Sequence, residues 1–150
     1  MLAVQFAKHG ARRRYRCIVV GEPLQDRDTL TGRIGRAADG RRAVVADHIA
    51  GKKAITHFEV IQRFAHASEL KVRLETGRTH QIRIHMAHIG CPIVGEPVYG
   101  KPHDEGQRAP RMMLHANQLN LEHPMTGRPM HFTADLPDEF VAFRSGLSTS

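Results

Sequence analysis

The chain has 150 residues, of which 41% are hydrophobic and 25% are charged, with a formal net charge of +7. This length predicts one domain over residues 1–150, with residues 144–150 as a tail. Two cysteines are too few for a disulfide framework, and no apolar run reaches the length of a membrane span, so a cytoplasmic protein is expected. The positive charge favours a polyanionic partner such as RNA or DNA.

The first half of the chain is predicted to contain mostly short strands. Apolar patterning and turn residues indicate the end of an amphipathic helix at 1–7, a strand at 15–20, a loop at 23–40 with a short strand around Ile34, and a strand at 43–46. Two longer alternating segments follow at 54–64 and 69–75, with Leu70, Val72 and Leu74 on one side and Lys71 and Arg73 on the other. We expect these two segments to form an antiparallel hairpin with one face in water.

The hydrophobic period changes to that of a helix after residue 79. Ile82, Met86 and Ile89 are spaced for a helix over residues 80–89, with Thr79 as N-cap and Gly90 just past its end. The rest is predicted as a turn-rich loop at 91–100, a polar and mobile segment at 101–110, strands at 112–121 and 129–134 joined by a turn at 123–127, and a short helix at 137–143. Strands that come mostly as hairpins indicate the α+β class, with a mixed, mainly antiparallel sheet and few helices.

The segment from residue 74 to residue 85 carries the most chemistry. It reads as a strand, a turn at Gly77 and a helix start surrounded by two arginines and two histidines. Free N–H groups at a helix N-terminus favour an anion, and arginines strengthen that preference. From these residues alone, an anion site and a tight turn with a solvated basic face are both open.

Three motifs, in order, closely resemble the RluA type of RNA pseudouridine synthase. The first is G-R-T-H-Q-I-R-I-H at residues 77–85, preceded by L-x-T and followed by A-H-I-G-C-P-I-V-G-E-P-V-Y-G at 87–100. The second runs from L-H-A at 114–116 through H-P at 123–124 and T-G at 126–127 to L-P at 136–137. The third, R-R-Y-R-C-I-V-V-G at 13–21, is similar to the family's tyrosine strand, with Arg for Lys and Cys for Ala.

The resemblance implies part of a pseudouridine synthase catalytic fold acting on RNA, either rRNA or tRNA. Enzymes of this type break the glycosidic bond of a uridine, turn the base and rejoin it through carbon, using no metal or organic cofactor. Arg83 matches the arginine that pairs with the family's catalytic aspartate, and Tyr15 matches the active-site tyrosine that stacks on the base. Ile82 matches an apolar residue of the base pocket. Charge and position add a further group of expected substrate contacts: Arg78, His80, Gln81, Arg33 and Arg36.

The family's catalytic aspartate has no counterpart among the residues before Tyr15. Its H-R-L-D motif lies upstream of the tyrosine strand in the family, and none of the fourteen residues before Tyr15 is Asp. The segment D-R-D-T-L-T-G at 26–32 resembles that motif superficially, but it lacks H-R-L and follows the tyrosine. We therefore expect a chain that begins after the catalytic loop. Three hypotheses remain open: an incomplete form of a true enzyme, a non-catalytic RNA-binding remnant, and half of a split enzyme completed by a partner chain.

The histidines near the predicted helix do not have the spacing of a zinc site. His80, His85 and His88 are separated by five and three residues, whereas zinc helices pair histidines four apart. No metal site is expected.

Overall fold

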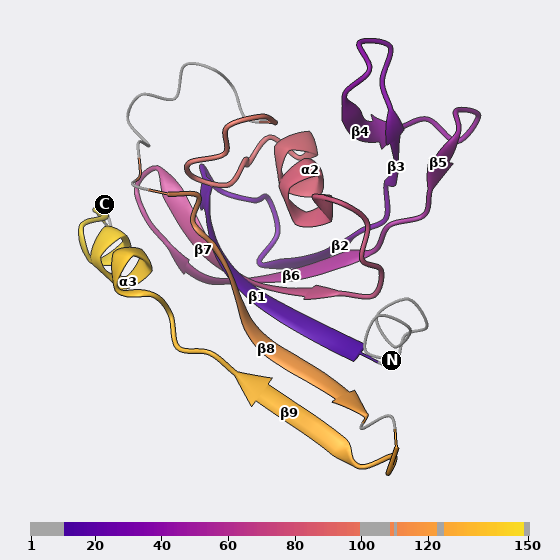
Figure 1. The fold of residues 1–150 in the computed structure, drawn as a ribbon. Helices are drawn as coiled ribbons and strands as arrows, with labels where there is room; N and C mark the ends of the chain where they lie inside the picture. The colour runs from indigo at the N-terminus through magenta and orange to yellow at the C-terminus, as the bar shows by residue number, and fades with distance from the viewer. Residues whose placement is uncertain (1–10, 100–108, 110, 123–124, 149–150) are drawn as a thin grey trace.

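The computed structural model describes residues 11–99, 109, 111–122 and 125–148 of the chain. The helix end predicted at residues 1–7 and the polar segment at 101–108 lie outside these residues, as does part of the turn predicted at 123–127. The described residues form two sheets and two helices (Figure 1).

The larger sheet has six strands in the order β2-β6-β7-β1-β8-β9, and every neighbouring pair is antiparallel. Its strands are β1 (Ala11–Val20), β2 (Arg27–Leu30), β6 (Thr56–Arg63), β7 (Ala67–Leu74), β8 (Leu114–Glu122) and β9 (Pro129–Thr133). The hairpin predicted at 54–64 and 69–75 is confirmed as β6 and β7. The last two predicted strands are confirmed as β8 and β9. The α+β class with a mainly antiparallel sheet is confirmed.

A second, three-stranded sheet lies on the same side of the larger sheet as helix α2 (Figure 1). It has the order β4-β3-β5 and consists of β3 (Arg33–Arg36), β4 (Arg42–Val45) and β5 (Gly51–Lys52). Ile34 of β3 and Ala54 pack against Ile84 of α2 (Gln81–His88), and this small cluster joins the second sheet to the helix. The sheet therefore holds its arginines beside the start of α2.

The alternation of side chains divides the larger sheet into two unlike faces. The face that packs against α2, here called the α2 face, carries the main apolar cluster, in which Leu70 and Val72 of β7 contact Ile82 and Met86 of the helix. The neighbouring residues Lys71 and Arg73 point the other way and are exposed, as predicted from the sequence. Burial of the apolar residues on one side thus fixes the register of β7.

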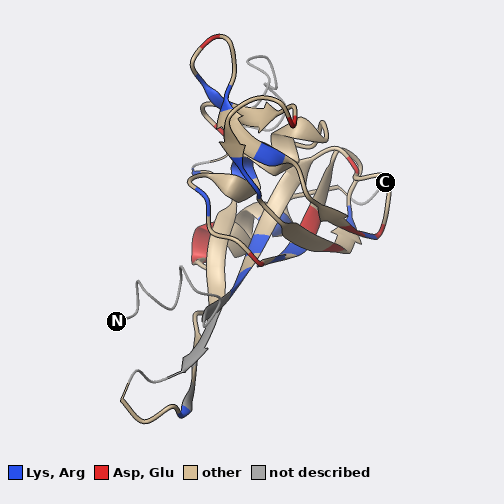
Figure 2. Ribbon diagram, turned by 90° about the vertical axis from the view of Figure 1, so that its right-hand side faces the viewer, with Lys and Arg blue, Asp and Glu red and all other residues tan. Residues whose placement is uncertain are grey.

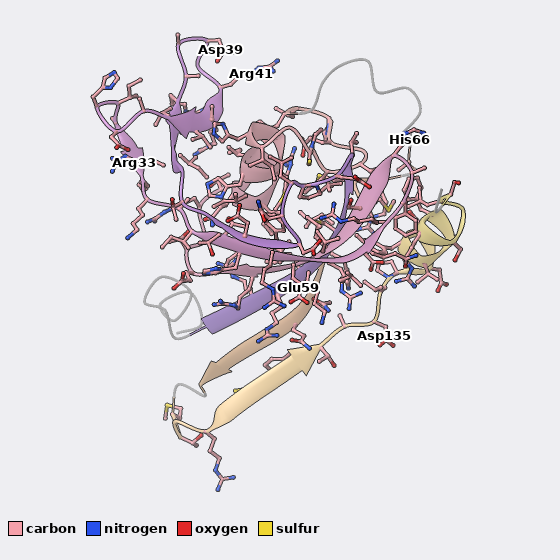
Figure 3. The ribbon with its side chains drawn as sticks, turned by 180° about the vertical axis from the view of Figure 1, so that it is seen from behind. Arg33, Asp39, Arg41, Glu59, His66 and Asp135 are labelled. Carbon is pink, nitrogen blue, oxygen red and sulfur yellow. The ribbon has the colours of Figure 1, made fainter. Side chains whose placement is uncertain are left out.

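Helix α3 (Asp138–Ser145) covers one end of the opposite face. Phe140 of the helix packs on Ile18 and Ala67, and a buried carboxylate ties the helix to the strands. That carboxylate, Glu69, lies 3.0 Å from Arg16 and 3.3 Å from Arg144 of α3. The rest of this face, toward β2 and the start of β1, has no described segment packed over it (Figures 1 and 3).

Several predicted boundaries were wrong, and those of β1 and β2 were wrong because tertiary pairing overrides local propensity. β1 begins at Ala11, not at 15, because its arginines pair with β7 and β8 on both sides. β2 lies inside the predicted loop at 23–40, because β6 supplies it with backbone partners despite its polar residues. The two-residue strand β5 was not predicted. α3 continues to Ser145, past the predicted end at residue 143, which makes the first residues of the expected tail helical.

Candidate active site

The turn before α2 adopts a strained backbone conformation. His80 has φ 55°, and it is the only residue other than glycine with a positive φ among those that the structure describes. His80, not the predicted Thr79, is the N-cap residue, and its side chain makes no capping bond to the helix. A non-glycine residue in this region costs free energy and persists only where its surroundings hold it. The described contacts show what holds it.

The Gln81 side chain stabilises this turn through four hydrogen bonds. Its Oε1 accepts from the Thr76 hydroxyl at 2.6 Å and from the Arg78 backbone N–H at 3.0 Å. Its Nε2 donates to the Ile55 carbonyl at 3.0 Å and to the Thr56 hydroxyl at 2.9 Å. Both donors and both acceptor positions of the amide are thus used, and the residue is 2% exposed. Gln81 fastens the end of β7 and the start of α2 to β6.

His85 extends this network to the second sheet. Its Nε2 lies 2.9 Å from the Gly32 carbonyl and its Nδ1 lies 2.8 Å from the Thr56 hydroxyl. A carbonyl only accepts, so Nε2 carries a proton; in the neutral ring, Nδ1 then accepts from the Thr56 hydroxyl. Burial lowers the pKa of His85, in agreement with a neutral ring. The helix is thereby joined to the residue just before β3.

Arg83 is held by a buried carboxylate from the loop after α2. Its Nε and Nη2 donate to the two oxygens of Glu96, each at 2.7 Å, in a bidentate arrangement. The Glu96 side chain is 1% exposed, and its Oε1 also accepts from the backbone N–H groups of Val98 and Tyr99. Burial raises the pKa of Glu96, but the hydrogen bonds from Arg83, Val98 and Tyr99 outweigh it and hold that pKa below its usual value. Hydrogen bonding to Glu96 raises the pKa of Arg83 in turn, so both groups stay charged.

Tyr99 connects this ion pair to the strained turn. Its ring centroid lies 5.2 Å from the Arg83 guanidinium carbon, and its hydroxyl lies 2.8 Å from Nδ1 of His80. Burial, followed by the positive charge of Arg83, lowers the pKa of His80. A cation over an aromatic face is stabilised by the ring's negative quadrupole. The left-handed His80 is thus fixed through Tyr99 to the same loop that holds Arg83.

Tyr15 and Ile82 lie on the same apolar cluster. Tyr15 stands in β1 opposite Val72 of β7, next to a β-bulge in the pairing with β8, and is half-buried. Ile82, 4% exposed, belongs to the α2-face cluster on which the Tyr15 ring packs. Arg83 follows Ile82 directly in the first turn of α2, so two of the three family-matched residues are neighbours in the helix that covers the cluster on which Tyr15 packs.

The predicted basic contacts occupy the rim around the second sheet. Arg78 is exposed and donates from Nε to the Lys53 carbonyl at 2.9 Å. Arg33 donates from Nη2 to the Gly51 carbonyl at 2.6 Å, while its Nε is buried without a partner among the described residues. Arg36 is exposed and bonds to the Gly40 carbonyl in its own hairpin. Figure 3 shows Arg33 beside the second sheet. Each of these arginines is anchored by a backbone carbonyl, and none pairs with a carboxylate among the described residues.

The residues that resemble a displaced aspartate loop do not meet Arg83. Asp26 pairs with Arg63 at 2.9 Å on the opposite sheet edge, and Asp28 bonds to the backbone N–H of Thr29 in β2. Within the described ranges no group of three His, Cys, Asp or Glu side chains is arranged to hold a metal ion. Cys17 and Cys91 are free and buried, and burial raises the pKa of both thiols.

Comparison with known proteins places this geometry in a family. The family model described as RNA pseudouridylate synthase matches residues 1–88, which is more than half of the chain. The chain belongs to the RNA pseudouridylate synthase family. It is 42% identical over 147 residues to the ribosomal large subunit pseudouridine synthase D of Zymomonas mobilis, a match that covers 92% of this chain and 45% of the relative. The corresponding protein of Pseudomonas aeruginosa is 40% identical, with 93% and 47% covered.

Solved structures of this family confirm the fold. The human RNA pseudouridylate synthase domain containing 1 superposes with a TM-score of 0.82 at 26% identity, over 99% of this chain and 63% of that one. The resemblance to the RluA type drawn from the three motifs is therefore confirmed. The chain spans about half the length of the curated relatives that it matches. No helix in the described part of the chain is long and apolar enough to cross a membrane.

Glu96 and Tyr99 are site residues that the sequence analysis did not single out. Both stand in the G-E-P-V-Y-G segment that matched the synthase family, and the segment was predicted only as a turn-rich loop. The available signal was a single carboxylate between apolar residues and prolines, shortly after a helix rich in basic residues. Such a carboxylate needs a cationic partner if it is buried, and Arg83 is that partner.

Proposed function

We propose that this chain forms the arginine- and tyrosine-bearing half of an RNA pseudouridine synthase active site. The observation that carries the proposal is the fixed position of Arg83. Its Nε and Nη2 are held by the buried Glu96, and Nη1 has no partner among the described residues. A guanidinium held along one edge is oriented in advance for a carboxylate at its remaining N–H groups.

The reaction requires a carboxylate that the 150 residues do not supply in an H-R-L-D motif. In the proposed site, Arg83 keeps that aspartate ionised and oriented, because an adjacent positive charge lowers the pKa of a carboxyl group. Tyr15 stacks on the extruded uracil, and its hydroxyl takes part in the transfer of the proton that leaves the base carbon after the new bond forms. Ile82 forms the apolar wall against which the base lies. A target base in a stacked helix must be flipped out to reach these groups.

The remaining predicted contacts take different parts in this proposal. Arg33, Arg36 and Arg78 stand at the rim and meet phosphates beside the target nucleotide. His80 contacts the nucleotide from the strained turn, while Gln81, whose hydrogen-bonding groups are all used inside the protein, supports the turn from behind. RNA of the large ribosomal subunit is the proposed substrate, in the light of the relatives' names. A cytoplasmic location, a single domain and an aspartate loop supplied on a partner chain are further proposals.

The test uses RNA that carries tritium at carbon 5 of uridine, which is released when the base is rejoined through that carbon. The chain alone is expected to release none. A chimera in which the N-terminal part of the Pseudomonas relative precedes residue 1 is expected to release tritium. Arg83→Gln or Tyr15→Phe in the chimera should reduce the rate at least about a hundredfold, in the range of a lost catalytic group. Full activity of either variant, or tritium release by the chain alone with both Asp26→Asn and Asp28→Asn, would contradict the proposal.

A further inference from the structure

The face of the larger sheet opposite α2 holds a basic hollow whose charged residues have no role in the proposed active site, although Tyr15 of that site also borders it. The hollow has a volume of about 560 Å³ and is formed by β1, β2, β6, β7 and β8. Five basic side chains line it, against the carboxylates of Asp28 and Glu59: Arg14, Arg16, Arg27, Lys71 and Arg73. Figure 2 shows blue segments of Lys and Arg along these strands, and Figure 3 shows Glu59 on the side of the sheet away from α2. We call it the basic sheet face.

Strand alternation determines why these side chains share one face. Tyr15, Val72 and Phe58 are neighbours across β1, β7 and β6 and point toward α2. The residues on either side of each must therefore point the other way. Arg14 and Arg16 flank Tyr15 in this manner, as Lys71 and Arg73 flank Val72. The charged side chains of the basic sheet face consequently point away from α2.

Two pairs of like charges stand directly opposite each other on this face. Arg14 is the register partner of Arg73, and Arg16 is that of Lys71. Directly opposed like charges destabilise a sheet. Glu69 offsets Arg16 at 3.0 Å, whereas Arg14 has no hydrogen bond or ion pair in the described part of the chain. Among the described residues, Arg73 has no hydrogen bond or ion pair, but its positive charge helps to lower the pKa of Glu75. The Arg14–Arg73 pair is thus expected to cost stability, since neither arginine has a hydrogen bond or ion pair within the described residues.

Polar atoms next to this pair are also left without partners. The Nε of Arg16 and the Oδ1 of Asn117, both of residues that line the hollow, are buried and have no hydrogen bond to the described residues. Buried polar atoms normally have partners, because a lost hydrogen bond is costly. Opposed cations and unpartnered polar atoms in one hollow are the features of a surface that is completed by a polar, negatively charged ligand.

We propose that the basic sheet face binds the phosphate backbone of RNA, as a second contact surface apart from the α2 face. Arginine forks fit phosphate oxygens bidentately, and a flat row of cations on neighbouring strands follows a chain of phosphates. A protein partner fits less well, because the centre of a protein interface is depleted of charged side chains, and here the lining side chains are mainly charged. The inference rests on the proposed function to the extent that RNA is the ligand.

The test compares two double variants of the full chain with the same change in net charge. Arg14→Gln with Arg73→Gln removes the uncompensated pair, and Arg111→Gln with Arg128→Gln removes two exposed arginines elsewhere. Binding of a fluorescein-labelled ribosomal RNA hairpin is followed by anisotropy over a range of salt concentrations. The first double should weaken binding about tenfold at low salt and reduce the salt slope by about two, while the second should change each far less.

Two further measurements separate charge recognition from misfolding and from failure of the proposed function. The midpoint of thermal unfolding of Arg14→Gln/Arg73→Gln should equal or exceed that of the wild type, since a repulsive pair is removed. Arg14→Lys with Arg73→Lys keeps the charge and should retain most of the affinity. Equal binding by the two Gln doubles, with strong binding by the wild type, would overturn the basic sheet face and leave the proposed function intact. No salt-sensitive RNA binding by the wild type would overturn both.

Discussion

The two faces of the larger sheet use charged residues in opposite ways. On the α2 face, the site groups are bound to one another: Arg83 to Glu96, His80 to Tyr99, and His85 to Thr56 and the Gly32 carbonyl. On the basic sheet face, Arg14 stands directly opposite Arg73, and neither side chain has a hydrogen bond or ion pair within the described residues. Internal partners fix a group in one orientation, which serves chemistry. Cations without an internal partner are available to interact with a negatively charged ligand, which serves binding. The comparison predicts that substitutions on the first face cost stability and that substitutions on the second do not.

The largest effect is expected at Glu96. Glu96→Gln removes the charge that faces Arg83 inside a site where the carboxylate is 1% exposed and the arginine 14% exposed. Breaking such a pair leaves a poorly solvated guanidinium, so the free energy of unfolding should fall by about 3 kcal/mol. Urea unfolding followed by circular dichroism measures the loss. The matched control is Glu59→Gln on the opposite face, whose pair with Arg27 is exposed and 3.7 Å long, and it should change stability by less than about 0.5 kcal/mol. Equal losses in the free energy of unfolding for Glu96→Gln and Glu59→Gln would contradict the proposed difference between the two faces.

Gln81 should give the next largest effect. Gln81→Leu keeps a similar volume but removes all four hydrogen bonds of the amide, leaving the Ile55 carbonyl and the Thr56 hydroxyl without this donor. Unsatisfied buried groups of this kind cost about 2 kcal/mol together with the loosened turn. Denaturant unfolding measures the free energy of unfolding of Gln81→Leu. The control is Gln62→Leu at an exposed position of β6. Loss of RNA binding without loss of stability in Gln81→Leu would instead assign Gln81 a direct contact with substrate.

The sequence predicted the apolar skeleton of the fold better than its polar strands. β6, β7 and α2 were found because burial on one side enforces a period of two in a strand and 3.6 in a helix. β2 was missed because Arg27, Asp28 and Thr29 carry no such period. The strand exists through backbone pairing with β6, a long-range partner that local patterning does not reveal.

For the candidate site, motif resemblance identified residues but not their partners. Arg83 was predicted to face a catalytic aspartate, and the structure adds Glu96 on the guanidinium edge formed by Nε and Nη2. Which carboxylate reaches an arginine depends on how the loop after α2 folds back, and residue spacing does not encode that. Thr79 was a reasonable N-cap by residue type, but the tie between His80 and Tyr99 places the cap one residue later.

Acid should weaken the α2 face through His85. Burial depresses the pKa of His85 in the folded protein below the 6.5 of the free side chain, so the unfolded chain binds the proton more readily. The contribution of the neutral His85 ring to the free energy of unfolding is therefore fully present above pH 6.5. It is lost as the pH drops below that value. His85→Gln does not titrate, so the difference in unfolding midpoint between wild type and variant should narrow in acid. The exposed His48→Gln is the control for the loss of a histidine outside this network. A constant difference for His85→Gln would mean that the ring is not the buried neutral form inferred from its partners.

The smallest effect, opposite in sign, is expected on the basic sheet face. Arg14→Glu replaces a repulsive cross-strand pair with Arg73 by an attractive one, which should raise the free energy of unfolding by about 0.5 kcal/mol. Arg128→Glu in the exposed turn before β9 makes the same charge change without an opposed partner and should be neutral within the error of urea unfolding. A gain in stability together with weaker RNA binding by Arg14→Glu would distinguish the two faces. Substitution of a residue that stabilises the fold would lower the free energy of unfolding instead. If Arg14→Glu destabilises the chain instead, the arginine contributes to packing, and the opposed charges on this face cannot be read as the cost of a binding surface.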